Sequence, residues 1–414
     1  TTLFRSKRSS TVFIKENSPE DIQKILKKLP KNPVTFKVWR MDQIQSKQNI
    51  IKKLRLHQDQ MSRRNFIEVF TEEFEIFREH CRRITTQYSQ LKLLKESLIP
   101  GSEVTVQMDY SENYQCIYQD EPSALYFDRN LITVHPAVVH YQQDSKLQHK
   151  SFVFITDEMS HSASTTFAVV SRLVPEIKKF LPNLNSIHYI SDSPSSQYRN
   201  KSIVKIIADH PTVFGGITAT WEYLEAGHGK GPCDGIGGAI KKQAEIAVKR
   251  GELIVNSASF GLWARKEEKN VKVIEVIRPE IRKAEDKLKN ATFVKGISTA
   301  HSIRPHEGKI FIRETSCYEC CREEISLTHG WTKTNVSTLR QQMPTVPTIS
   351  TVVTIPTVST VPTVSTVSTV PTVSTVSTVS TVPTVSTVPT VSTVPTVSTV
   401  PTVSTVPTVS TVPT

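Results

Sequence analysis

Three short segments carry acidic residues of a kind that binds metal ions. Asp109 begins residues 109–114 (Asp-Tyr-Ser-Glu-Asn-Tyr), Asp192 lies in residues 191–200, and Asp234 lies in the glycine-rich residues 227–238. Carboxylate oxygens are preferred ligands of Mg²⁺ and Mn²⁺. Two such ions, about 4 Å apart, can activate a water or a 3′-hydroxyl and stabilise the leaving oxygen in phosphodiester cleavage. The three aspartates therefore suggest a two-metal site.

The apolar pattern predicts the elements that would position these acids. Val104, Val106 and Met108 alternate with polar residues, which is typical of a half-buried strand ending at Asp109. A second strand is expected over residues 186–190, just before Asp192, and a helix over residues 235–250, just after Asp234. Ligands of α/β folds bind where strands end at one edge of the sheet. Carboxylates that meet there repel one another unless a cation neutralises them.

The order of the remaining elements predicts the fold class. Three neighbouring strands precede alternating helices and strands, which implies a mixed sheet with helices on both faces. This order is that of an RNase H-like fold, here preceded by a helical region and followed by a repeat tail. The further strands are expected at residues 131–134, 138–139, 151–155, 216–223, 271–277 and 309–313, and the further helices at residues 18–29, 62–98, 165–180, 201–208 and 279–288.

Each aspartate also has a purely structural interpretation. Asp109 could end a strand, Asp192 could form a turn or cap a helix, and Asp234 could cap its own helix. The joint placement of all three favours the metal site over these alternatives. No strand end places Asp234, which is assigned from the helix start and from the family resemblance described below, and Glu222 and Glu225 are its nearest rivals.

Residues 227–231 form a glycine-rich loop that contains His228 and Lys230. The loop does not match a nucleotide-binding P-loop, because Gly231-Pro232 follows the lysine. Its glycines would let the backbone approach a DNA phosphate or the scissile group. The alternative is a tight connector between a strand and a helix.

The three segments resemble those of a group of transposon-derived proteins in animal genomes. That group carries Asp-Tyr/Phe-Ser-Glu-Asn-Tyr, then Ser-Asp-Gly-x-x-x-Gln-Tyr-Lys-Asn, then Ser-His-Gly-Lys-x-x-Cys-Asp-Gly-x-Gly-Gly. The likeness extends over residues 60–330, and Ser193 departs from it by replacing a glycine. The resemblance implies DDE/D transposase chemistry on DNA. Asp109, Asp192 and Asp234 would then hold two Mg²⁺ (or Mn²⁺) ions, with His228 and Lys230 as further catalytic residues.

Two functional hypotheses follow. The first is a transposase-like DNA-binding protein that cuts or joins phosphodiester bonds as a Mg-dependent nuclease or strand transferase. The alternative is a catalytically inactive, domesticated or degenerate transposon relic that acts as a nucleic-acid or protein binding module. DNA is the expected partner, a homo-oligomer is considered, and the nucleus is the expected location. A formal net charge of +12 agrees with a polyanionic partner but is not specific for one.

Composition divides the chain into parts. Residues 344–414 repeat (Pro or Ser)-Thr-Val and contain no charged residue, so all 51 Lys+Arg and 39 Asp+Glu precede them. Frequent proline and the lack of large apolar groups predict disorder. The sequence contains no run of 18 apolar residues, so no membrane span is expected. The expected parts are a basic disordered arm at 1–17, a helical region at 18–100, a core at 101–250, a cap or subdomain at 251–342 and the disordered repeat at 343–414.

A cysteine cluster lies near the end of the core sequence. Cys317 and Cys320 form a C-x₂-C pair, followed by Cys321 and His329. Such a pair supplies half of a zinc site. No second well-spaced pair follows, so reduced structural cysteines are the favoured interpretation, and zinc is the alternative.

Overall fold

A computed structural model of the chain describes residues 18–29, 33–46, 49–118, 129–267, 270–319 and 325–334. The basic arm expected at residues 1–17 and the disordered repeat expected at 343–414 lie outside the described residues. Within the described ranges, no helix combines the length and apolar character needed to cross a bilayer.

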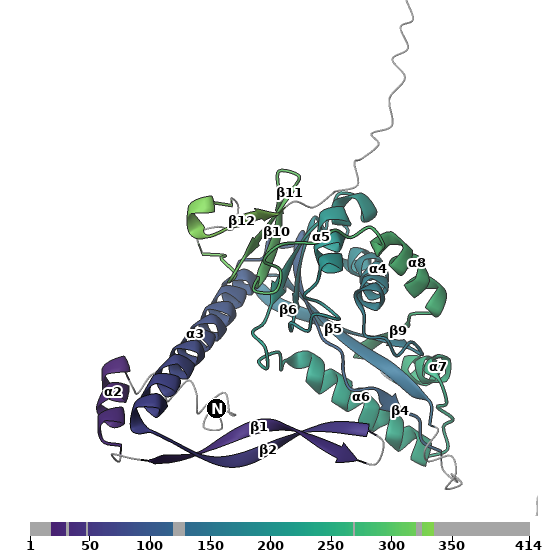
Figure 1. Ribbon diagram of the computed structural model, residues 1–414. Coiled ribbons are helices and arrows are strands. Elements are labelled where there is room, and N and C mark those ends of the chain that lie inside the picture. The colour runs from purple at the N-terminus through teal and green to yellow at the C-terminus, as the bar shows by residue number, and fades with distance from the viewer. Residues whose placement is uncertain are drawn as a thin grey trace, which may run out of the picture. The chain divides into compact units, whose positions relative to one another are not determined.

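A mixed sheet of ten strands, counted over the described residues, forms the centre of the protein (Figure 1). Its order is β12-β11-β10-β8-β7-β3-β5-β6-β9, and β4 pairs with β5 beside this path. The strands are β3 (Glu103–Met108), β4 (Tyr114–Gln115), β5 (Leu131–Gln143), β6 (Lys146–Thr156), β7 (Ser186–Ser191), β8 (Thr218–Tyr223), β9 (Val271–Glu275), β10 (Ser302–His306), β11 (Lys309–Arg313) and β12 (Thr332–Thr334).

Strand β3 is central and belongs to both an antiparallel and a parallel part of the sheet. It pairs antiparallel with β5, and β5 pairs antiparallel with β6. On its other side β3 pairs parallel with β7, and β7 pairs parallel with β8. The carboxyl ends of β3, β7 and β8 therefore lie at the same edge of the sheet.

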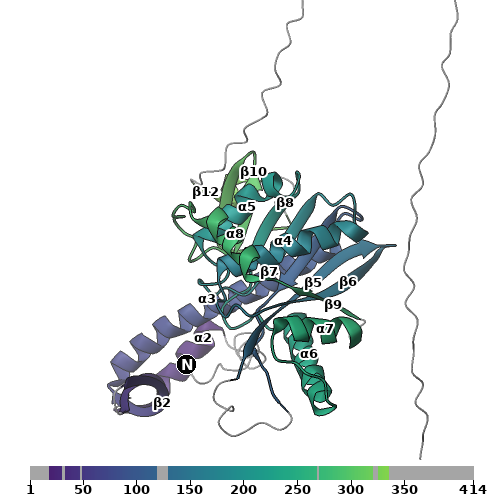
Figure 2. The ribbon, with the colours of Figure 1, turned by 90° about the vertical axis from the view of Figure 1, so that its right-hand side faces the viewer.

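Helices cover both faces of this sheet (Figure 2). Phe152 and Phe154 of β6 join a core with helices α4, α5 and α8, whereas Val153 and Ile155 join a core with α6 and α7. This alternation follows from the two-residue period of a strand and explains the predicted mixed α/β class. The helices are α4 (Ala163–Phe180), α5 (Lys201–Val213), α6 (Pro232–Lys249), α7 (Ser257–Glu267) and α8 (Arg278–Leu288).

Two helices precede the sheet, as predicted. Ser18 caps α2 (Pro19–Lys27) through a capping box, and Ser62 caps α3 (Arg63–Glu96). Helix α3 has 34 residues, which corresponds to a length of about 50 Å. Leu91, Leu94 and Leu98 pack against Ile190 of β7, so the carboxyl end of α3 is anchored on the sheet.

The prediction of a helical region at residues 18–100 was wrong for the middle part of that range. Strands β1 (Val34–Ser46) and β2 (Asn49–Met61) form a separate antiparallel hairpin there. Val34, Phe36 and Val38 alternate with Thr35 and Lys37, and this two-residue period favours a strand over a helix. The hairpin contacts α3 through the rings of Phe36 and Phe66, whose centroids are 5.2 Å apart.

The strand pair expected at residues 131–134 and 138–139 is one continuous strand, β5. Pro136 lies in its middle, opposite Val153 of β6. Proline has no N–H to donate, but its carbonyl still accepts a hydrogen bond from the Asp109 N–H at 3.2 Å. Proline therefore does not interrupt the ladder at this position.

Candidate functional site

Asp109 and Asp192 occupy equivalent positions on neighbouring strands. The parallel register of β3 and β7 places Gln107 opposite Ile190. Continuing this register by two residues brings Asp109 level with Asp192, one residue beyond the end of each strand. Both side chains are half-buried. The sheet therefore places these two predicted site residues side by side at its edge.

Burial and neighbouring carboxylates raise the pKa of both aspartates. Burial, together with the charges of Asp192 and Asp234, raises the pKa of Asp109 to about 7. Burial and the charge of Asp234 raise the pKa of Asp192 to about 6, against the opposing charge of Arg199. Oδ1 of Asp192 is buried and has no hydrogen-bond partner among the described residues. A low-dielectric site of this kind favours neutralisation by a proton or a cation.

Asp234 is close enough to affect both pKa values, but its side chain has another contact. It is the third residue of α6 and accepts a hydrogen bond from the Gly231 N–H at 2.8 Å. The helix-capping alternative therefore describes its present conformation. Among the residues that the structure describes, no group of three or more His, Cys, Asp or Glu side chains is arranged to hold one metal ion.

The glycines of residues 227–238 make room for the other two predicted segments. A Cβ added to Gly229 would lie 2.7 Å from the Cβ of Asp192, and one added to Gly237 would lie 2.6 Å from Oγ of Ser111. A Cβ on Gly231 would overlap the side-chain amide of Gln107. The Cys233 thiol also donates to the Gln107 carbonyl at 3.3 Å. The three predicted segments are therefore in direct contact.

The two other predicted catalytic residues differ in their surroundings. Lys230 is exposed, whereas His228 is half-buried against His80 of α3, with 3.1 Å between their Nε2 atoms. The rivals of Asp234 have other contacts. Glu222 is fully buried and accepts from the hydroxyls of Ser316 and Tyr318. Glu225 contacts His80, Arg83 and His301.

An aromatic stack beside Asp109 was not predicted. The ring of Tyr110 lies between His135 and His161, with centroid distances of 3.9 and 4.3 Å. Burial, followed by the charge of His161, lowers the pKa of His135 to about 3, so this imidazole is neutral at physiological pH. His135 Nε2 also lies 2.7 Å from the Tyr198 hydroxyl. The stack holds the backbone next to Asp109 in place. In the sequence, the tyrosines of the motifs were the only feature that could have indicated such a stack.

The predicted cysteine cluster is described in part. Cys317 is buried and packs with Phe311 and Trp331. Cys320 and Cys321 lie outside the described residues. Zinc binding by Cys317, Cys320, Cys321 and His329 therefore stays a prediction.

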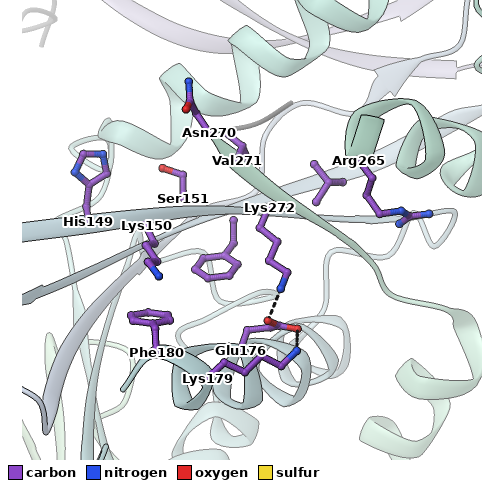
Figure 3. Close-up of a pocket in the computed structure, with 12 residues that line it drawn as sticks. His149, Lys150, Ser151, Glu176, Lys179, Phe180, Arg265, Asn270, Val271 and Lys272 are labelled. Atoms are coloured by element: carbon purple, nitrogen blue, oxygen red, sulfur yellow. Dashed lines mark hydrogen bonds and ion pairs between the residues drawn. The ribbon is translucent and has the colours of Figure 1, made fainter. Parts of the chain in front are cut away.

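Several cavities among the described residues have positively charged linings. One is lined by Ser193, the residue directly after Asp192, and by Arg199 and Lys201. A second lies between the open side of β6, the start of β9 and the carboxyl ends of α4 and α7 (Figure 3). Its lining includes Lys150, Lys179, Arg265 and Lys272 but only one carboxylate, that of Glu176.

Positive charge in the second cavity is only partly neutralised. Lys179 and Lys272 contact Glu176 at 2.8 and 2.6 Å, and both ion pairs are visible in Figure 3. The ammonium of Lys150 lies 3.9 Å from the centre of the Phe180 ring. The lining as a whole therefore has an excess of positive charge that suits an anionic ligand.

The comparisons with known proteins identify a family but no function. The chain matches the family described as "Domain of unknown function (DUF8701)" over residues 87–316, which is more than half of its 414 residues. The match includes all three aspartates and the strands that position them. No curated protein and no solved structure matches the chain. The chain therefore belongs to the DUF8701 family.

Proposed function

We propose that the protein has an RNase H-like core of the DDE/D transposase type and that it cuts or joins phosphodiester bonds in DNA. The observation that carries this proposal is the register of β3 and β7, which brings Asp109 level with Asp192. Apart from the two-residue β4, the chain order from β3 to α6 is three strands, helix, strand, helix, strand and helix, which is the order expected for this fold. A transposon origin, as the motif resemblance implies, belongs to the same proposal.

The donor set fits a hard divalent cation at two of its three positions. Asp109 and Asp192 offer half-buried carboxylates whose pKa values are raised by burial and by neighbouring acids, and one oxygen of Asp192 has no partner among the described residues. Oxygen ligands of this kind suit Mg²⁺ or Mn²⁺. Asp234 would complete the set after releasing the Gly231 N–H, a change of its own rotamer at the exposed start of α6. When bound, two such ions supply Lewis-acid activation and stabilise the leaving oxygen.

The protein's own residues would hold the DNA strand. Arg199 and Lys201 line one cavity together with Ser193, and Lys230 is exposed on the loop that touches Asp192 through Gly229. These cations would bind the phosphates on either side of the scissile bond and orient it toward the two aspartates. The second positive cavity would hold backbone phosphates further along the DNA (Figure 3).

The alternative is a relic that binds DNA or protein without cutting. The observation that favours it is the helix-capping contact of Asp234, since this carboxylate is engaged with its own backbone. The two functions differ in a measurable way. A binding module would retain salt-dependent DNA affinity without metal-dependent cleavage.

The test is a DNA-nicking assay with Mg²⁺ that compares the wild-type protein with Asp192→Asn. We expect nicking by the wild type, its loss in EDTA and a large loss in the variant. Asp286→Asn is a matched control, because Asp286 lies on the exposed side of α8 and pairs only locally with Lys289. Equal nicking by Asp192→Asn and wild type would reject the assignment. DNA binding without nicking by the wild type would favour the relic.

A further inference from the structure

Glu225, in the loop after β8, is the centre of a charged cluster. Its side chain is 9% exposed. Nδ1 of His80 lies 2.9 Å from Oε1, while Nε of Arg83 and Nε2 of His301 lie 3.1 and 2.7 Å from Oε2. Although burial opposes ionisation, the contacts with His301, His80 and Arg83 hold the pKa of Glu225 well below its usual range. Glu225 is therefore a fixed anion.

His80 connects this anion to the glycine-rich loop. A carboxylate can only accept hydrogen bonds, so Nδ1 of His80 must carry a proton. Nε2 of His80 and Nε2 of His228 are 3.1 Å apart and must share one proton between them. When both rings are neutral, His80 has its single proton on Nδ1, so the shared proton belongs to Nε2 of His228. Glu225 thus determines the tautomer of His228 through His80.

The backbone of His228 is also held in place. The Tyr88 hydroxyl donates to its carbonyl at 2.6 Å, and its N–H donates to the Glu225 carbonyl at 2.9 Å. The next residue, Gly229, is the one whose Cα lies against Asp192. His80, Arg83 and Tyr88 share one face of α3, so this helix holds the loop against the edge of the sheet.

We propose that His80 is a positioning residue of the phosphodiester site, acting through His228. With Glu225 behind it, His80 fixes the ring orientation and the proton placement of His228, and it thereby holds Gly229 and Lys230 beside Asp192. This inference rests on the proposed function for its catalytic consequence but not for the tautomer. His80 also lies outside residues 87–316, so the family match does not include it.

Glu225, His80 and His228 form a hydrogen-bond relay that sets the position of the proton on His228. The first test reverses this relay by replacing Glu225 with glutamine. His301 contacts Oε2 and Arg83 contacts both oxygens, so the NH₂ group of the variant faces His80 when its amide oxygen keeps the contact with His301. His80 must then carry its proton on Nε2, and His228 must carry its proton on Nδ1. Two-bond ¹H–¹⁵N NMR of histidine-labelled protein at pH 8, without DNA or metal, distinguishes these tautomers. We expect Nε2–H on His228 in the wild type and Nδ1–H in Glu225→Gln.

The second test removes the relay residue, and it remains informative if Glu225→Gln does not fold. We expect His80→Gln to lower the kcat of Mg²⁺-dependent nicking by about 10- to 100-fold with little change in KM, as for other residues that orient a site. We also expect faster amide hydrogen exchange at residues 227–231. Arg82→Gln is the control, since Arg82 is exposed on the same helix and pairs with Glu79 one turn away, and it should retain nearly wild-type kcat.

The outcomes separate the two proposals. A wild-type His228 protonated on Nδ1, or a His80→Gln variant with wild-type kcat, would overturn the relay. A wild-type protein that nicks no DNA would overturn the proposed function, and the tautomers and loop exchange would then decide the relay by themselves. The relay is supported if the proton of His228 lies on Nε2 in the wild type and on Nδ1 in Glu225→Gln, and if residues 227–231 exchange their amide hydrogens faster in His80→Gln.

Discussion

Gly229 leaves room for Asp192 that no other residue type would leave. A Cβ at Gly229 would approach the Cβ of Asp192 to 2.7 Å, and the backbone of Gly229 does not have a positive φ. The glycine is therefore needed for close contact and not for backbone freedom. This contact joins the loop of residues 227–231 to the edge of the sheet where the aspartates lie.

Replacing Gly229 with alanine should displace Asp192. We expect Gly229→Ala to lower stability by about 1–3 kcal/mol, as other overpacking substitutions do, and to abolish metal-dependent nicking. Chemical denaturation and the nicking assay measure the two effects. Gly238→Ala is a matched control, because its Cβ would meet nothing within 4 Å on α6. Alanine there should be neutral or stabilising by up to about 1 kcal/mol. Similar behaviour of the two variants would contradict the contact.

Much of the fold could be predicted because its signals are local. Apolar periodicity predicts the helices that begin after Ser18 and Ser62 and the strands that end before Asp109 and Asp192. The hairpin of β1 and β2 was missed because it lies between two strong helical patterns. The two parts of β5 were separated at Pro136, although the proline carbonyl still takes part in the ladder.

The sequence predicts contacts in the site only between residues that are near in sequence or that end adjacent strands. The proximity of Asp109 and Asp192 follows from strand ends and a parallel sheet. The cluster around Glu225 does not, because His80 and His301 are far apart in sequence and meet only through the packing of α3. The stack of Tyr110 between His135 and His161 likewise joins residues that are far apart in the sequence. Long-range polar contacts of this kind leave no periodic signal.

Asp109→Asn should stabilise the metal-free protein at pH 8. The pKa of Asp109 is raised from 3.8 to about 7, so its contribution to stability is present below pH 4 and is lost as pH rises through 7. Removing the charge should raise the free energy of unfolding in EDTA, by on the order of 2 kcal/mol. Mg²⁺ should raise the melting temperature of the wild type but not of the variant. A variant less stable than wild type in EDTA would contradict this electrostatic argument.

His210 should make the protein sensitive to acid. Burial lowers its pKa from 6.5 to about 4, although the hydrogen bond to the Ile217 carbonyl at 2.7 Å opposes the shift. The unfolded state therefore binds a proton that the folded state does not between about pH 6.5 and 4, and stability falls as pH falls through this window. The full loss is about 3 kcal/mol.

His210→Gln should reduce this pH dependence, because an amide can donate to Ile217 and accept from the Tyr189 hydroxyl without titrating. Urea denaturation at several pH values between 4 and 7 measures the slope for both proteins. Gln148→Asn is the control, since Gln148 is exposed and carries no titratable group. An unchanged slope in His210→Gln would mean that other groups dominate acid unfolding.

The second positive cavity should contribute to DNA affinity through phosphate contacts alone. Lys150 and Lys272 line it, and replacing both with glutamine leaves Glu176 paired with Lys179 (Figure 3). Each lost phosphate contact reduces the slope of log affinity against log salt by about one, so the double variant should lose about two. Fluorescence anisotropy with duplex DNA in EDTA measures this slope without any cleavage. Lys266→Gln on α7 is the control, because Lys266 pairs with Glu252 and is not part of the lining. If the double variant and the control keep the wild-type slope, DNA does not contact this cavity, whereas a loss confined to the double variant assigns it to the DNA path.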